Sequence, residues 1–136
     1  MKDDVLLSYA EVIILGMMFF VFAVNVAPRF AQAETDGRIC DLIDSLEKVR
    51  PQLDLYRAQH AGKLPPTASF AGFQKAMTKR AGRYGPYVKK VPANPFNGLN
   101  TIRFDGEPAG ANKTGWRLDT GTGLFQADDD AAHAEL

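Results

Sequence analysis

The chain has 136 residues, with 16 basic and 16 acidic side chains that leave a formal net charge of zero. This balance excludes a global electrostatic field that would attract nucleic acid or acidic substrates. The single cysteine, Cys40, excludes an internal disulfide and a cysteine-based metal cage, and we expect it to pack as a small buried side chain on a helix.

The N-terminal part of the chain contains an apolar stretch from Val5 to Ala27. As a helix its 23 residues would measure about 34 Å, compared with about 30 Å for the hydrocarbon core of a bilayer. Every face of the segment Val12 to Val24 would be apolar, which predicts a covering of lipid or other helices. The alternative is a secretory signal peptide: Ala31-Gln32-Ala33 favours it, whereas Asp3 and Asp4 do not.

Glu11 is the one charged residue within the apolar stretch. A carboxylate in hydrocarbon costs about 3 kcal/mol, so such a residue usually marks a function or a partner. In a dry core Glu11 would require a cation at close range, and we interpret it as a residue that sets the register between subunits. Gly16, Met17 and Met18 either allow close and adaptable packing between helices or are ordinary lipid-facing residues.

Two further helical patterns follow. The helix is predicted to continue or bend at Pro28 and to become amphipathic from Ile39, because apolar residues then recur at intervals of three and four as far as His60. Pro51 interrupts this stripe and either bends the helix or begins a new one. A short helix is predicted from Ser69 to Thr78.

The last third of the chain predicts short strands at residues 101–104, 115–119 and 124–126, the last two forming a hairpin-like pair. Residues 127–136 are acidic and are predicted to be frayed. The predicted fold is therefore α+β. A long N-terminal α-helix, membrane-spanning in its first half and amphipathic in its second, packs on a small antiparallel β-sheet.

Three N-terminal residues and two later motifs form a recognisable pattern. If Leu7 is counted as the first residue, Glu11 is the fifth and Pro28 the twenty-second. Farther along, the chain contains Asn94-Pro95-Phe96-Asn97-Gly98 and Gly115-Trp116. These features resemble type IV pilins and type II secretion pseudopilins, in particular the major, G-type class. Mature chains of that family begin with a hydrophobic residue, carry a glutamate at the fifth position and reach a proline near the twenty-second.

The resemblance implies a pilin-like fold and a subunit that assembles into a helical homo-oligomeric filament. It implies a leader or extension at residues 1–6, a hydrophobic transmembrane or filament-core helix at 7–28, a globular domain at 29–126 and an acidic flexible tail at 127–136. It also implies a single-pass stage in a bacterial inner membrane with a periplasmic domain. Filament assembly machinery then moves the subunit into a periplasmic or extracellular filament.

Processing of the N-terminus is a further implication. A prepilin peptidase would cut between Leu6 and Leu7 and methylate the new N-terminus. The family nearly always places glycine before the cut, and this chain has Leu6 there. If the leader stays, Glu11 would instead meet Lys2 or the Met1 amine of an adjacent subunit, or would act only in extraction from the membrane.

Other candidate chemistry is sparse. Asp119 and Asp128 are weak candidates for calcium, which related G-type pseudopilins bind in a C-terminal loop; the alternative is that they are solvated carboxylates. We otherwise expect no cofactor. His60 and His133 are too few and too separated for a metal or nucleophile site, and His60 is expected at a helix end. No catalytic or phosphate-binding motif is present, so we predict that the chain is not an enzyme.

A basic segment without an intervening acid runs from Lys75 to Lys90 and includes Tyr84 and Tyr87. It would touch nucleic acid or an anionic surface, or would pair with the acids of the amphipathic helix or tail of a neighbouring copy; the zero net charge favours the second interpretation. The predicted function is a structural filament subunit. The alternatives are a monomeric, membrane-tethered periplasmic binding module and a DNA-binding pilin.

Overall fold

The computed structural model describes residues 8–136, except for the side chains of residues 25–28, 30 and 31 within the first helix. The elements in chain order are α1 (Tyr9–Gln59), α2 (Phe70–Thr78), β1 (Ile102–Phe104), β2 (Trp116–Leu118), β3 (Phe125–Ala127) and a short 3₁₀ helix, η1 (His133–Glu135). The chain divides into two compact units, Met1–Gly37 and Arg38–Leu136, and α1 contributes to both. The boundary predicted from the sequence, after residue 28, lies nine residues earlier.

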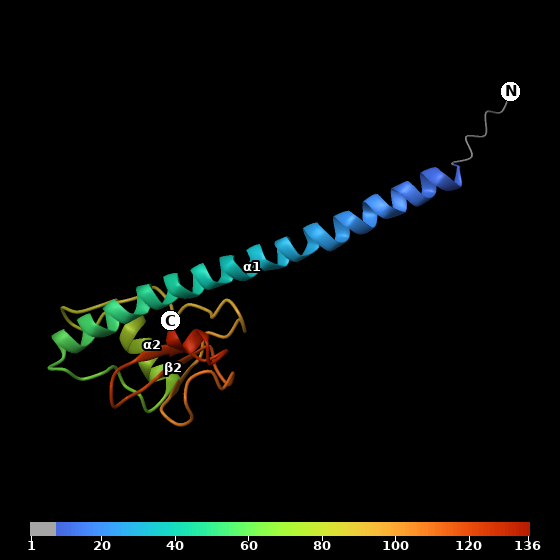
Figure 1. Cartoon of the computed structure of the whole chain (residues 1–136). Helices are drawn as coiled ribbons and strands as arrows, with labels where there is room; N and C mark the ends of the chain where they lie inside the picture. Colours follow the sequence, from blue (N-terminus) through green and yellow to red (C-terminus); the bar gives the residue numbers. More distant parts are fainter. Residues whose placement is uncertain (1–7) are drawn as a thin grey trace. The chain divides into compact units, whose positions relative to one another are not determined.

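The second unit has a core between α1, α2 and the sheet, and Figure 1 shows α2 and β2 beside the later part of α1. The buried face of α1 consists of Leu42, Leu46, Val49 and Leu53, which lie at intervals of three and four. Full burial of each such side chain contributes about 1.5–3 kcal/mol. The predicted amphipathic helix is confirmed, and it continues through Pro51 without a break.

Helix α2 forms where it was predicted. Ser69 has an extended backbone and caps the helix by accepting a hydrogen bond at Oγ from the amide of Gly72 at 3.1 Å. The helix buries Phe73 and Met77. The Met77 carbonyl also accepts hydrogen bonds from the Tyr87 and Val88 amides, which fastens the following segment to the helix.

All three predicted strands are present, but the predicted antiparallel sheet is wrong. Strands β2 and β3 are antiparallel as expected, whereas β1 pairs with β2 in parallel, with Ile102 opposite Trp116. A parallel pair requires a connection long enough to return to the starting end. Residues 105–115 form this connection. The loop wraps around the buried carboxylate of Asp128, which accepts hydrogen bonds from the amides of Gly110 and Thr114.

The predicted pilin-like fold class is corrected on a second point, the membrane-spanning first half of the helix. Across the described residues, no helical segment is both long enough and apolar enough to traverse a bilayer. The structure is α+β with a mixed three-stranded sheet.

The C-terminal residues are folded, in contrast to the predicted flexible tail. Arg50 on α1 donates to the carbonyls of Phe125 and Leu136, both at 2.9 Å. The Gln126 amide nitrogen donates to the Ala134 carbonyl at 2.9 Å, and Ala134 is buried. These bonds hold η1 against the sheet and α1.

Cys40 also differs from expectation. It lies on α1 and is exposed, so the predicted burial of this side chain is wrong.

Candidate assembly site

The most unusual surface of the first unit is the apolar part of α1 from Val12 to Val24, which we call the apolar segment. It carries eleven large apolar side chains, and each is between 53% and 78% exposed. They occupy every face of the helix because they are almost consecutive. Single exposed apolar residues are ordinary on protein surfaces, whereas a contiguous apolar surface marks a site of interaction.

Glu11 lies at the start of α1, where it forms a capping box with Ser8. The Ser8 amide donates to Glu11 Oε2 at 2.8 Å, and the Glu11 amide donates to Ser8 Oγ at 3.3 Å. This reciprocal pair satisfies amides at the helix start that have no partner within the helix. The pattern Ser-x-x-Glu at residues 8–11 is the sequence signal that could have predicted this capping box.

The structure describes the other predicted assembly residues only in part. Gly16 leaves open space, because a Cβ built on it would meet no atom within 4 Å. Leu6 and Leu7 lie outside the described residues, as does the side chain of Pro28. Helix α1 passes through Pro28 without interruption.

Asp128, one of the two calcium candidates, is fully buried. Its carboxylate accepts hydrogen bonds from one loop and from one arginine. Arg103 donates from Nε to Oδ2 at 2.9 Å and from Nη2 to Oδ1 at 2.6 Å. This carboxylate also accepts hydrogen bonds from the loop, with donor-to-oxygen distances of 3.0–3.3 Å. The donors are the amides of Gly110, Ala111, Lys113 and Thr114 and the Thr114 hydroxyl. Burial raises the pKa of Asp128, but the hydrogen bonds from Arg103 and Thr114 outweigh it and bring the pKa to about 2. A carboxylate paired with a guanidinium in this way is not available to calcium.

Asp119, the second calcium candidate, organises the turn before β3. Its Oδ1 accepts hydrogen bonds from the amides of Gly121 and Thr122, and its Oδ2 accepts one from Arg117 Nη2 at 3.3 Å. The hydrogen bonds from Thr122 lower the pKa of Asp119. Within the described part of the chain, no group of three or more His, Cys, Asp or Glu side chains could hold a metal ion.

The two histidines lie in separate aromatic contacts. His60 follows the end of α1, as expected, and stacks on Tyr56 with ring centroids 3.9 Å apart. His133 contacts Phe96 and pairs with Asp129, with Nδ1 2.5 Å from Oδ2. Neither arrangement presents a nucleophile.

The motifs that carry the family resemblance act as scaffold in the second unit. Buried Asn94 donates from Nδ2 to the Gly115 carbonyl at 2.9 Å, and Trp116 Nε1 donates to the Pro92 carbonyl at 2.8 Å. Gly115 is required by close approach, because a Cβ there would lie 1.9 Å from the Leu99 carbonyl oxygen. The two motifs therefore fix the loop at residues 94–98 against β2.

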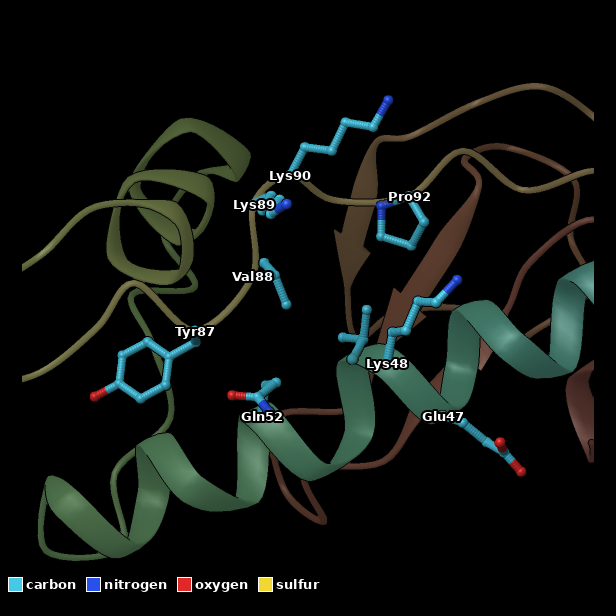
Figure 2. Close-up of a pocket in the computed structure, with 9 residues that line it drawn as sticks. Glu47, Lys48, Gln52, Tyr87, Val88, Lys89, Lys90 and Pro92 are labelled. Atoms are coloured by element: carbon cyan, nitrogen blue, oxygen red, sulfur yellow. The ribbon is translucent and has the colours of Figure 1, made fainter.

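A groove of about 500 Å³ lies between α1 and the segment that follows α2. Its lining combines apolar side chains, including Val88 and Pro92, with the basic side chains of Lys48, Lys89 and Lys90 (Figure 2). Glu47 also lines it, and its carboxylate points away from the loop that carries Lys89 and Lys90 (Figure 2). A second hollow of about 430 Å³ shares Lys89 and Lys90 and adds Lys75 and Lys79. We call these five lysines and the two hollows the basic groove.

Comparison with known proteins gives no family assignment. No protein-family model, no curated protein and no solved structure matches the chain.

Proposed function

We propose that this chain is the structural subunit of a filament related to type IV pili or type II secretion pseudopili, and that it polymerises through the apolar segment of α1. The observation that carries the proposal is the exposure of eleven large apolar side chains on all faces of one helix. A single flat partner would cover only one of these faces. Either lipid or several copies around each helix would cover all of them, and in the proposed filament several copies do so.

The free energy available supports self-association. The helix itself already covers part of each of these side chains, so we count about 1 kcal/mol for covering the remainder, rather than the 1.5–3 kcal/mol of full burial. Eleven side chains then contribute on the order of 10 kcal/mol per copy. Association costs about 4–15 kcal/mol in lost freedom, so burial of this segment offsets a large part of that cost. Contacts between unlike surfaces of identical copies build a ring where the rotation between copies closes and an open helical filament where it does not, and we propose the open filament.

Glu11 is proposed to select the neighbouring copy through its charge. The Glu11 side chain also forms the capping box with Ser8. Experiments therefore have to separate its role at the helix start from its role in selecting a neighbour. Glu11→Gln keeps a residue type that forms capping boxes but removes the charge, whereas Ser8→Ala removes the cap and keeps the charge. A register role predicts that Glu11→Gln lowers the yield of fibres and that Ser8→Ala leaves it near the wild-type level. The reverse pattern would assign Glu11 to the helix start alone.

Electron microscopy of sheared, detergent-free fractions tests the proposal itself. The full-length chain is expected to form fibres, and Phe19→Glu is expected to abolish them, because it places a charge at the most exposed of the eleven positions. Ala58→Glu, at an exposed position of α1 in the second unit, is the matched control and should form fibres. A wild-type chain that stays monomeric would favour the binding module instead. Localisation at an inner membrane before assembly rests on the family resemblance alone.

A further inference from the structure

The second unit carries two surfaces of opposite charge that no described contact within the chain satisfies. We infer that the basic groove binds the acidic strip of α1, consisting of Asp41, Asp44 and Glu47, from a second copy of this chain. This inference rests on the proposed function, since it names the contact that the second units would make within the filament. It concerns residues outside the apolar segment and is testable separately.

The basic groove has an excess of uncompensated charge. None of Lys48, Lys75, Lys79, Lys89 and Lys90 forms an ion pair with any residue that the structure describes. Its wall is preformed, because the Tyr87 and Val88 amides are bound to the Met77 carbonyl and the Tyr87 hydroxyl donates to Gln59 Oε1 at 2.7 Å. Lysine stems and the apolar side chains of Val88 and Pro92 suit a partner that presents carboxylates on an apolar surface.

The acidic strip has the complementary composition. Asp41, Asp44 and Glu47 are exposed and recur every three residues, on the side of α1 away from buried Leu42 and Leu46. Since α1 is one continuous helix, Asp41 and Asp44 cannot leave it to enter the groove of their own copy. A second copy must supply them.

Three acids near the C-terminus are less suitable because their carboxylates are already bonded. Asp128 is buried against Arg103, and Asp129 is bound to His133 and to Asn94 Nδ2 at 2.6 Å. Asp130 accepts the Ala132 amide at 2.8 Å. Three of the C-terminal acids, which the sequence left as an alternative partner for the basic segment, are therefore already bonded within their own fold.

Nucleic acid is a poorer fit to this groove than a helix with carboxylates. Base recognition on a basic surface usually needs exposed aromatic rings on which bases stack. The Tyr87 ring instead packs beside Tyr56, with centroids 5.1 Å apart, and Tyr84 lies against His60 at 5.5 Å.

The native cysteine gives a direct test, because exposed Cys40 immediately precedes Asp41. In the full-length chain, Lys89→Cys with a short bis-maleimide should link Cys40 of one copy to position 89 of another and produce a ladder of multimers. Lys63→Cys, an exposed lysine outside the basic groove, is the matched control and should give only the background of wild-type protein. A link within one copy does not change the mass, so the ladder reports contact between copies. Peptide mapping that finds no link between positions 40 and 89, or as much between 40 and 63, overturns the inference.

A charge swap tests whether attraction is the cause. For this test Lys75→Cys provides the second thiol in every chain, so that positions 89 and 90 are free to vary. Lys89→Glu with Lys90→Glu should lower the linking of positions 40 and 75 on the order of tenfold, and adding Asp41→Lys with Asp44→Lys should restore it. Unchanged linking after the first change, or no recovery after the second, contradicts the inference. Emission of the buried Trp116 checks that each variant is folded.

The two proposals fail in different ways. Fibres without any link between the basic groove and the acidic strip would support the filament proposal and refute the contact between groove and strip. Links without fibres would keep the contact and remove the filament. Salt-sensitive binding of a single-stranded oligonucleotide that is lost in Lys89→Glu with Lys90→Glu, in the absence of links, would assign the groove to nucleic acid and overturn the inference.

Discussion

Replacement of Asp128 by Asn should strongly destabilise the second unit. The substitution keeps the size of a fully buried side chain but removes the charge that faces Arg103 at 2.6 Å. Removing one partner of a buried ion pair costs about 3–5 kcal/mol. Arg103 retains hydrogen bonds to the carbonyls of Asp105, Glu107 and Pro108, so we expect about 3 kcal/mol, at the lower end.

The pKa of Asp128 gives a second route to the same magnitude. Its fall from 3.8 to about 2 corresponds to stabilisation of the folded state on the order of 2 kcal/mol at neutral pH. Because the pKa is lower in the folded chain, this contribution is complete above about pH 4 and is lost as the pH falls from 4 towards 2. Asp128→Asn lacks this titration, so the difference in stability between the two proteins should shrink over the same interval.

Urea unfolding followed by Trp116 fluorescence measures both effects, because Trp116 is the single tryptophan and is buried beside β3. The free energy of unfolding of wild type and variant should differ by about 3 kcal/mol at pH 7 and by clearly less near pH 2. A difference below 1 kcal/mol at pH 7, or one that does not change with pH, would refute the role of Asp128 as a charged acceptor at the centre of the loop.

Three other substitutions are expected to have graded effects in the same assay. Gly115→Ala should cost about 3 kcal/mol, because its Cβ would lie 1.9 Å from the Leu99 carbonyl oxygen; a neutral result would show that the loop moves freely. Met77→Ala should cost about 2–5 kcal/mol, since it opens a cavity in the core, and a loss under 1 kcal/mol would contradict the packing. Lys113→Ala should cost under about 1 kcal/mol, because its ion pair with Glu107 is exposed on both sides, and a larger loss would mean that the pair is not a simple surface contact.

The helices of the second unit were readable from the sequence because their apolar residues repeat at helical spacing. Leu42, Leu46, Val49 and Leu53 all lie in the core, and Ser69 caps α2 where the pattern begins. The positions of the strands could also be predicted from local sequence patterns. Their relative direction could not be predicted, because the parallel pairing of β1 and β2 depends on a loop held by Asp128, which is ten residues beyond the end of β2. A contact of this kind leaves no periodic signal.

The polar residues were harder to interpret. Asp128 looked like one of several solvated acids, and only the fold brings Arg103 and four backbone amides to it. Glu11 was recognised as unusual, but its bond to Ser8 was missed although the capping signal is local. Cys40 was predicted to be buried from the habits of free cysteines, whereas the exposed face of the amphipathic helix determines its position.

The central claim is that the apolar segments of several copies pack against one another. A photoreactive amino acid at position 19, in place of the exposed Phe19, tests it in cells that produce the full-length chain. We predict covalent multimers in which the linked peptides come from residues 12–24 of neighbouring copies. Irradiated protein that carries only lipid adducts, or links only to other proteins, would contradict the claim.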